Sequence, residues 1–162
     1  MSVAPKAKSP TKRESKMISD FEKAMGSDCV ESLFLRERSI MFTVKPSAML
    51  KAVEFMKEKW GLYHCSTITG MDLEGGKLAV IYHFEAQGVT VNVKEVVPTA
   101  KPVADSIVAL IPGAEFYERE VFDMIGVEFK GHPDLRRLVL PEDFPKGVHP
   151  LRKSWKSPRA DK

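Results

Sequence analysis

Three strand-like runs joined by short glycine-containing turns constrain the fold of this chain most. The runs span residues 62–70, 77–85 and 89–97, and the turns between them contain Gly75, Gly76 and Gly88. In the last run Val89, Val91 and Val93 alternate with polar residues, as in a strand with one buried face. Connections this short link antiparallel neighbours, so the sequence predicts an antiparallel sheet.

Further elements flank this sheet. Residues 30–35 and 40–44 predict two strands, and helices are expected at residues 18–25, 47–60, 103–110 and 115–126. The clearest helix carries an apolar stripe at helical spacing, formed by Met49, Val53, Met56 and Trp60. We therefore expect an α+β fold: a mostly antiparallel sheet with helices on one face, followed by a long extended C-terminal segment.

Composition indicates one globular domain with tails. Of the 162 residues, 43% are hydrophobic and 29% charged, and no apolar run approaches the roughly 18 residues that a membrane span needs. The N-terminus is basic but lacks the apolar core of a secretory signal. Cys29 and Cys65 lack metal or redox spacing, which favours buried thiols in a reducing compartment.

Charge divides the chain into three parts. Residues 1–16 carry five basic residues and one acidic residue, and residues 130–162 carry nine basic and four acidic residues. The expected organisation is a disordered basic tail (1–16), an α+β domain (17–129) and an extended docking segment (130–162). Basic ends suit acidic or anionic partners, but no nucleic-acid-binding motif is present, so we expect no nucleic-acid partner.

No catalytic, cofactor or metal site is predicted. Glycine-rich phosphate loops are missing from the sequence, and the four histidines have no ligand spacing with other histidines, cysteines or carboxylates. They are His64, His83, His132 and His149.

The expected helix at residues 115–126 is unusually rich in acids. Glu115, Glu118, Glu120 and Asp123 accompany an arginine, and Phe122 lies among these charges. Three interpretations stay open: a docking surface for a partner, intramolecular packing against the following coil, or acid–base catalysis. That coil is rich in proline, glycine and arginine, so it needs a surface to hold it, and arginine suits paired contacts with carboxylates.

Two blocks in this region resemble the signature of the 30 kDa subunit of respiratory complex I, the C component of NADH dehydrogenase. The first reads EREVFDMIGVEFKGHPDLRR, and the second reads HPLRK. The matching residues are Glu118, Arg119, Glu120, Asp123, Gly126, Phe129, Gly131, His132, Pro133, Asp134, Leu135, Arg136, Arg137, His149, Pro150, Leu151, Arg152 and Lys153.

The resemblance implies a subunit without its own redox centre. It would belong to the peripheral arm of a membrane-attached, ion-translocating complex on the cytoplasmic side of the membrane. Its partners would be a large catalytic subunit and a cluster-bearing small subunit, and iron–sulfur clusters and a quinone site or nickel–iron centre would lie on those neighbours. The predicted partner interface comprises Glu115, Glu118, Arg119, Glu120, Phe122, Asp123, His132, Pro133, Asp134, Arg136, Arg137, His149, Pro150, Arg152 and Lys153.

One departure bears on the type of complex. The spacer at residues 145–148 is longer than the usual complex I version and resembles that of energy-converting hydrogenases and related archaeal complexes that use ferredoxin or deazaflavin. The interpretation therefore includes a [NiFe] hydrogenase or a ferredoxin-, deazaflavin- or sulfur-linked complex. An independent acid–base enzyme and a basic adaptor are the remote alternatives.

Overall fold

A five-stranded sheet forms the centre of the protein. The structure is a computed structural model that describes residues 9–73 and 75–157. The strand order is β1-β2-β5-β4-β3. Their bounds are β1 Cys29–Arg36, β2 Ser39–Val44, β3 Cys65–Leu73, β4 Lys77–Ala86 and β5 Val89–Pro98. Every neighbouring pair is antiparallel except β2 and β5, which are parallel. The mostly antiparallel sheet is confirmed.

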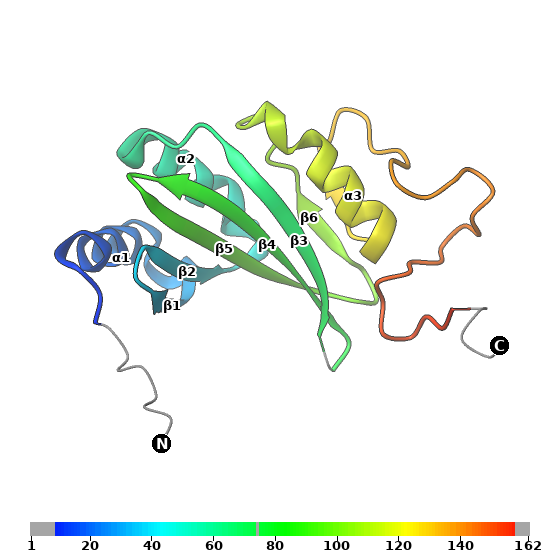
Figure 1. Cartoon of the computed structure of the whole chain (residues 1–162), viewed down its shortest axis with the longest axis horizontal. Coiled ribbons are helices and arrows are strands. Elements are labelled where there is room, and N and C mark those ends of the chain that lie inside the picture. The colour runs from blue at the N-terminus through cyan, green and yellow to red at the C-terminus, as the bar shows by residue number, and fades with distance from the viewer. Residues whose placement is uncertain (1–8, 74, 158–162) are drawn as a thin grey trace, which may run out of the picture.

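The helices cover one face of this sheet. They are α1 (Lys12–Met25), α2 (Met49–Trp60) and α3 (Glu115–Ile125). On β2, Phe42 stacks on Phe21 of α1 with ring centroids 3.9 Å apart, and it belongs to the same buried row as Tyr82 of β4. Figure 1 shows α1 and α3 at opposite ends of the sheet.

A close approach fixes α3 on the sheet. Gly70 of β3 faces α3, and a Cβ atom there would lie 2.8 Å from Cγ1 of Ile125 and 3.1 Å from Cγ1 of Val121. Only glycine allows the helix to lie this near the strand. The strand therefore sets where α3 and everything attached to it can lie.

The first helix begins earlier than the sequence analysis expects. It starts at Lys12 instead of residue 18, and its cap is Thr11, which forms a capping box with Glu14, instead of Ser19 or Asp20. Residues 12–16, expected to be disordered, are therefore helical, while residues 1–8 lie outside the described residues. Glu14 is buried, and its other carboxylate oxygen accepts the main-chain N–H of Arg38 in the β1–β2 turn.

The helix expected at residues 103–110 is wrong. Val103–Asp105 form β6, which pairs in parallel with β7 (Glu128–Lys130). Turns follow β6, and Lys57 of α2 donates from Nζ to the carbonyl of Leu110 at 2.6 Å. A pairing partner about 25 residues away decides this structure, and local propensity does not reveal it.

The strand expected at residues 62–70 begins and ends three residues later, as β3, and Cys29, expected to be buried, is less buried than Cys65. The helix expected at residues 47–60 agrees more closely with α2. All four residues of the α2 stripe are buried, and the helix ends at Gly61 in a left-handed conformation. Both cysteines are free; Cys65 is buried and Cys29 half-buried. None of the described helices is long and apolar enough to cross a membrane.

A carboxyl group lies buried on the helix-covered face. Glu95 of β5 is fully buried; Tyr82 donates from Oη to its Oε1 at 2.8 Å, and within the described chain its Oε2 has no hydrogen-bond partner. Burial raises the pKa of Glu95 to about 8 against the opposing hydrogen bond from Tyr82, and the charges of Asp105 and Glu118 add to the rise. Glu95 is therefore largely protonated at neutral pH.

We predict that stability falls as pH rises because of Glu95. Its folded pKa exceeds the ordinary value of about 4.3, so its stabilising contribution is complete below that value and is lost as the pH rises through about 8. The slope can reach about 1.4 kcal/mol per pH unit for one such group. Urea unfolding between pH 5 and 9 measures it. Glu95→Gln should flatten the slope, and Glu85→Gln, at an exposed position, should not; equal slopes in all three chains would contradict the assignment.

Candidate functional site: the α3 helix and the C-terminal strap

Residues 131–157, called the strap, follow β7 and contain neither α-helix nor β-strand. Figure 1 shows this segment looping beside α3, at the end of the sheet away from α1. A chain without regular structure needs other partners for its main-chain N–H and C=O groups. In this protein side chains of α3 and of the strap itself provide them.

Asp123 of α3 provides the most concentrated contact. Its Oδ2 accepts the main-chain N–H groups of Leu138, Val139 and Leu140 at 3.1, 2.9 and 2.9 Å. The carboxylate is 3% exposed. Burial opposes its ionisation, but these three hydrogen bonds and the charge of Arg137 outweigh it and lower the pKa of Asp123. Asp123 is thus a charged clamp on three consecutive residues of the strap.

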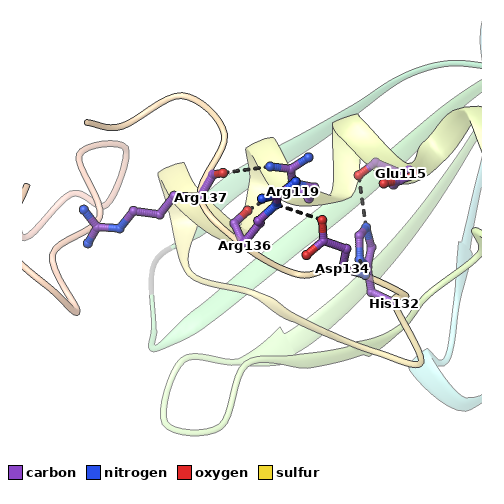
Figure 2. Close-up of polar contacts among 6 residues, drawn as sticks. All are labelled: Glu115, Arg119, His132, Asp134, Arg136 and Arg137. Atoms are coloured by element: carbon purple, nitrogen blue, oxygen red, sulfur yellow. Dashed lines mark hydrogen bonds and ion pairs between the residues drawn. The ribbon is translucent and has the colours of Figure 1, made fainter. Parts of the chain in front are cut away.

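Arg119, one turn earlier, binds the residues just before this clamp. Its Nε and one terminal nitrogen donate to the carbonyls of Arg136 and Arg137 at 3.1 and 2.8 Å (Figure 2). Arg119 is 6% exposed, and its Cζ lies 5.7 Å from the centroid of the Phe116 ring. Arg119 thus binds the carbonyl groups of residues 136 and 137, and Asp123 binds the N–H groups of residues 138–140.

His132 binds the start of α3. Its Nδ1 accepts the N–H of Asp134 at 3.0 Å, so its Nε2 carries the proton that is donated to the carbonyl of Glu115 at 3.1 Å (Figure 2). The bond from Asp134 requires an unprotonated Nδ1, because a nitrogen that carries a proton cannot accept. The pair Arg136–Asp134 lies at the surface, with 2.8 Å between Nε and Oδ2.

Arg137 organises the middle of the strap from within. Its guanidinium donates to the carbonyls of Pro141, Phe144 and Pro145 at 3.0, 2.7 and 3.3 Å. Figure 2 shows the side chain pointing away from α3. Residues 141–145 therefore close into a loop around one arginine.

The second block of the motif caps the end of α3. His149 donates from Nδ1 to the carbonyl of Asp123 at 3.0 Å, and Arg152 donates from Nε to that of Ile125 at 2.7 Å. These carbonyls lie in the last turn of the helix, where cations are favourable. Gly126 has φ +79°, and a Cβ atom there would lie 2.3 Å from Nε2 of His149. The glycine is needed both for the turn and for the space that the imidazole occupies.

Glu118 faces the opposite direction, into the domain. Its carboxylate accepts the hydroxyl of Ser106 at 2.6 Å and the N–H of Ile107 at 2.8 Å. Burial raises the pKa of Glu118 to about 7, although both hydrogen bonds act in the other direction. Glu118 thus connects α3 to the segment after β6.

The other residues of the predicted interface are more exposed. Glu120, Pro133 and Lys153 are exposed, and Pro150 is half-buried. Lys153 donates its main-chain N–H to Asp72 of β3 at 2.9 Å. Phe122 is half-buried and packs against the core instead of projecting between charges, whereas Phe116 is 58% exposed. The buried residues of α3 include the charged Glu118, Arg119 and Asp123.

Glu118, Glu120 and Asp123, three of the four acids for which catalysis was left open, do not converge. Glu118 and Asp123 accept hydrogen bonds on different sides of α3, and Glu120 borders a separate hollow beside β3 that Leu151 also lines. Within residues 9–73 and 75–157, no three His, Cys, Asp or Glu residues form a group that could hold a metal ion. Gly126, Ser106 and Asp72 complete these contacts, although none of them belongs to the predicted interface. Only Gly126 had a signal in the sequence, its place in the motif.

Comparison with known proteins identifies the family. The family model described as "Respiratory-chain NADH dehydrogenase, 30 Kd subunit" matches residues 42–160. The chain belongs to this family. It is 36% identical over 116 residues to the C component of the NADH-quinone oxidoreductase of Moorella thermoacetica, covering 70% of this chain and 77% of that protein. It spans only 55% of the corresponding component from Chloroherpeton thalassium, with 31% identity and 80% of this chain covered.

Two solved structures share the fold of this 30 kDa-family chain. A chain of the membrane-bound sulfane sulfur reductase, an archaeal respiratory membrane complex, matches with a TM-score of 0.79 and 25% identity over 90% of this chain and 86% of its own. A trypsin-resistant fragment of Nqo5 matches with a TM-score of 0.63 and 22% identity, covering 74% of this chain and 99% of the fragment. The second comparison supports the fold alone.

We predict that Asp123→Ala releases the strap from α3. Three main-chain N–H groups would lose a charged acceptor, which should lower the free energy of unfolding by about 2–4 kcal/mol. Urea unfolding and limited proteolysis measure the change, with new cleavage expected within residues 131–157. Glu120→Ala, at an exposed position on the same helix, is the control. An Asp123→Ala chain as stable and protease-resistant as this control would refute the clamp.

We also predict that Gly126→Ala is more damaging than Gly131→Ala. Both glycines have positive φ, +79° and +86°, so both substitutions strain the backbone by about 1 kcal/mol. Only at Gly126 does the new methyl group meet another residue, His149, while a Cβ atom at Gly131 would meet no described atom within 4 Å beyond its chain neighbours. Thermal unfolding should show a clearly larger loss for Gly126→Ala. Equal losses of stability in the two variants would mean that the His149 imidazole does not need the space left by the missing side chain at Gly126.

Proposed function

We propose that this chain is a non-catalytic docking subunit of a complex I-related, membrane-bound oxidoreductase. The observation that carries the proposal is the strap, a long irregular segment that α3 holds in one conformation. The strap and α3 form a surface that contacts the large catalytic subunit. Electron transfer then takes place on neighbours that carry iron–sulfur clusters and a quinone site or nickel–iron centre, and membrane subunits translocate ions.

The side chains left on the outside of the strap support this role. The Asp123 clamp uses the main-chain N–H groups of residues 138–140, while the side chains of Leu138 and Val139 are 41% and 54% exposed. Leu151 is 57% exposed farther along the strap. Apolar side chains that are exposed on a rigid backbone suit a protein interface, because little conformational entropy is lost when the partner covers them.

This arrangement assigns two roles to the predicted interface residues. Arg119, Asp123, His132, His149 and Arg152 hold the strap in place, and their polar groups bind within the chain. Contact with the partner then comes from the outer side chains, together with the exposed Arg136, Lys153, Glu120 and Pro133.

The comparisons support assembly with a larger subunit. A relative from Methylococcus capsulatus is named as a combined C/D component of NADH-quinone oxidoreductase; it is 46% identical over 76 residues, which cover 46% of this chain but 13% of that protein. A polypeptide that combines the C and D parts agrees with direct contact between the two. We propose that this chain lies peripherally on the cytoplasmic side of the membrane, in a hetero-oligomer without nucleic acid. The respiratory membrane complex above supports the assembly at a membrane.

A second candidate concerns the type of complex. The longer spacer at residues 145–148 and the fold shared with a chain of the sulfane sulfur reductase support a sulfur-, ferredoxin- or deazaflavin-linked complex, or a membrane-bound [NiFe] hydrogenase, as the alternative to NADH:quinone oxidoreductase. Purification of the native complex and assay with each electron donor distinguish these possibilities.

We predict that replacing the outer apolar residues weakens docking without unfolding the chain. The double variant Leu138→Ser/Val139→Ser removes exposed side chains and should bind the co-expressed large subunit at least about tenfold more weakly, equivalent to about 1.4 kcal/mol. Affinity co-purification followed by titration of the purified subunits measures this.

A matched control lies at the far edge of the sheet. Val30→Ser/Leu33→Ser changes two residues of β1 that are 63% and 39% exposed, and it should leave binding unchanged. Normal binding by the strap variant, or equal losses in both variants, would contradict the proposed interface.

A further inference from the structure

A hollow of about 530 Å³ lies between α3 and the strap. Three apolar side chains line it: Phe122 from the helix, and Leu135 and Val148 from two separate parts of the strap. All three are half-buried, and Phe122 and Leu135 also pack against the core. The hollow is thus formed between the two segments that the contacts described above hold together, and its shape depends on them.

Positive charge surrounds this apolar lining. Arg136, Arg137 and Lys146 border the hollow, and the imidazole of His149 lines it as a polar group. The carboxylate in its lining is that of Asp123, whose Oδ2 already accepts three N–H groups. Arg137 donates to main-chain carbonyls, and its charge lowers the pKa of Asp123, so these two opposite charges partly offset each other. Arg136 forms a surface pair with Asp134, and such pairs contribute little.

We propose that this hollow receives an acidic segment of the large subunit, in which a carboxylate-bearing residue lies next to an apolar one. The apolar side chain would pack on Phe122, Leu135 and Val148, and the carboxylate would meet Arg136 and Lys146. This inference rests on the proposed docking function and specifies the chemistry of one contact in it. Charge complementarity identifies the occupant: a basic rim around an apolar lining excludes a basic segment and fits an acidic, partly apolar one.

The electrostatic environment of the whole segment agrees with this occupant. Residues 130–162 carry nine basic and four acidic residues, so an acidic partner segment is attracted to this end of the molecule before contact. An arginine or lysine at the rim of an interface acts mainly on the association rate and its salt dependence. The contact should therefore weaken as salt concentration rises.

Charge reversal in the full-length chain tests the proposal. Arg136→Glu/Lys146→Glu, both at exposed positions, should weaken binding of the co-expressed large subunit at least tenfold and abolish most of its salt dependence. The matched control Lys77→Glu/Lys101→Glu makes the same charge change at exposed positions outside the lining of the hollow, and it should bind like the wild type.

Zero-length carbodiimide cross-linking identifies the occupant. In the assembled complex, Nζ of Lys146 should form an amide bond with an aspartate or glutamate of the large subunit, located by mass spectrometry. Lys146→Arg keeps the charge and should keep the association while losing this cross-link.

The outcomes separate this inference from the function on which it rests. If the wild type and the control variant fail to bind the large subunit, the docking function fails and this inference with it. If both bind but charge reversal has no effect, or Lys146 cross-links elsewhere, only the inference about the hollow is overturned. Nuclease-sensitive binding of nucleic acid, lost in the charge-reversal variant, would likewise overturn it.

Discussion

The carboxylate of Asp123 is the contact on which the strap depends. A segment of 27 residues without helix or strand would otherwise leave many main-chain groups to water, and it would sample many conformations. One buried, ionised oxygen binds three consecutive N–H groups and fixes residues 138–140 against α3. The contacts from Arg119, His132, His149 and Arg152 fix the rest, and all of them bind main-chain atoms. These contacts therefore make the strap part of the folded domain, although it contains neither helix nor strand.

The position of α3 in turn depends on the sheet. Gly70 lets the helix lie against β3, and Glu118 connects the helix to the segment after β6. These two contacts lie on the side of α3 opposite its contacts with the strap. A surface for a partner is thus fixed in space by a chain of short-range interactions that begins in the core.

The sheet and α2 could be predicted from local pattern, because alternation, short turns and a helical stripe are local signals. The capping box of Thr11 and Glu14 was also present in the sequence and would have placed the start of α1 correctly. β6 could not be predicted in this way, because its partner β7 follows α3 in the sequence and the pairing depends on the tertiary fold. Short strands that pair in this way have little intrinsic preference for the strand conformation.

The motif was recognisable, but the roles of its residues were not. Acids crowded on one helix resemble a catalytic cluster or an ion-pair network, yet here Glu118 and Asp123 accept hydrogen bonds from main-chain N–H groups on different sides of α3. Which backbone groups lack partners becomes known only once the strap is folded. Whether the predicted interface residues contact a partner stays a prediction, since most of their polar groups already bind within the chain.

Hydrogen–deuterium exchange of the isolated wild-type chain tests the central claim most directly. If α3 holds the strap in place before any partner binds, the amides of Leu138, Val139 and Leu140 should exchange far more slowly than free peptide, at rates close to those of the sheet. Exchange of these amides at free-peptide rates, with protection appearing only in the assembled complex, would contradict the account, because the partner and not Asp123 would then order the strap.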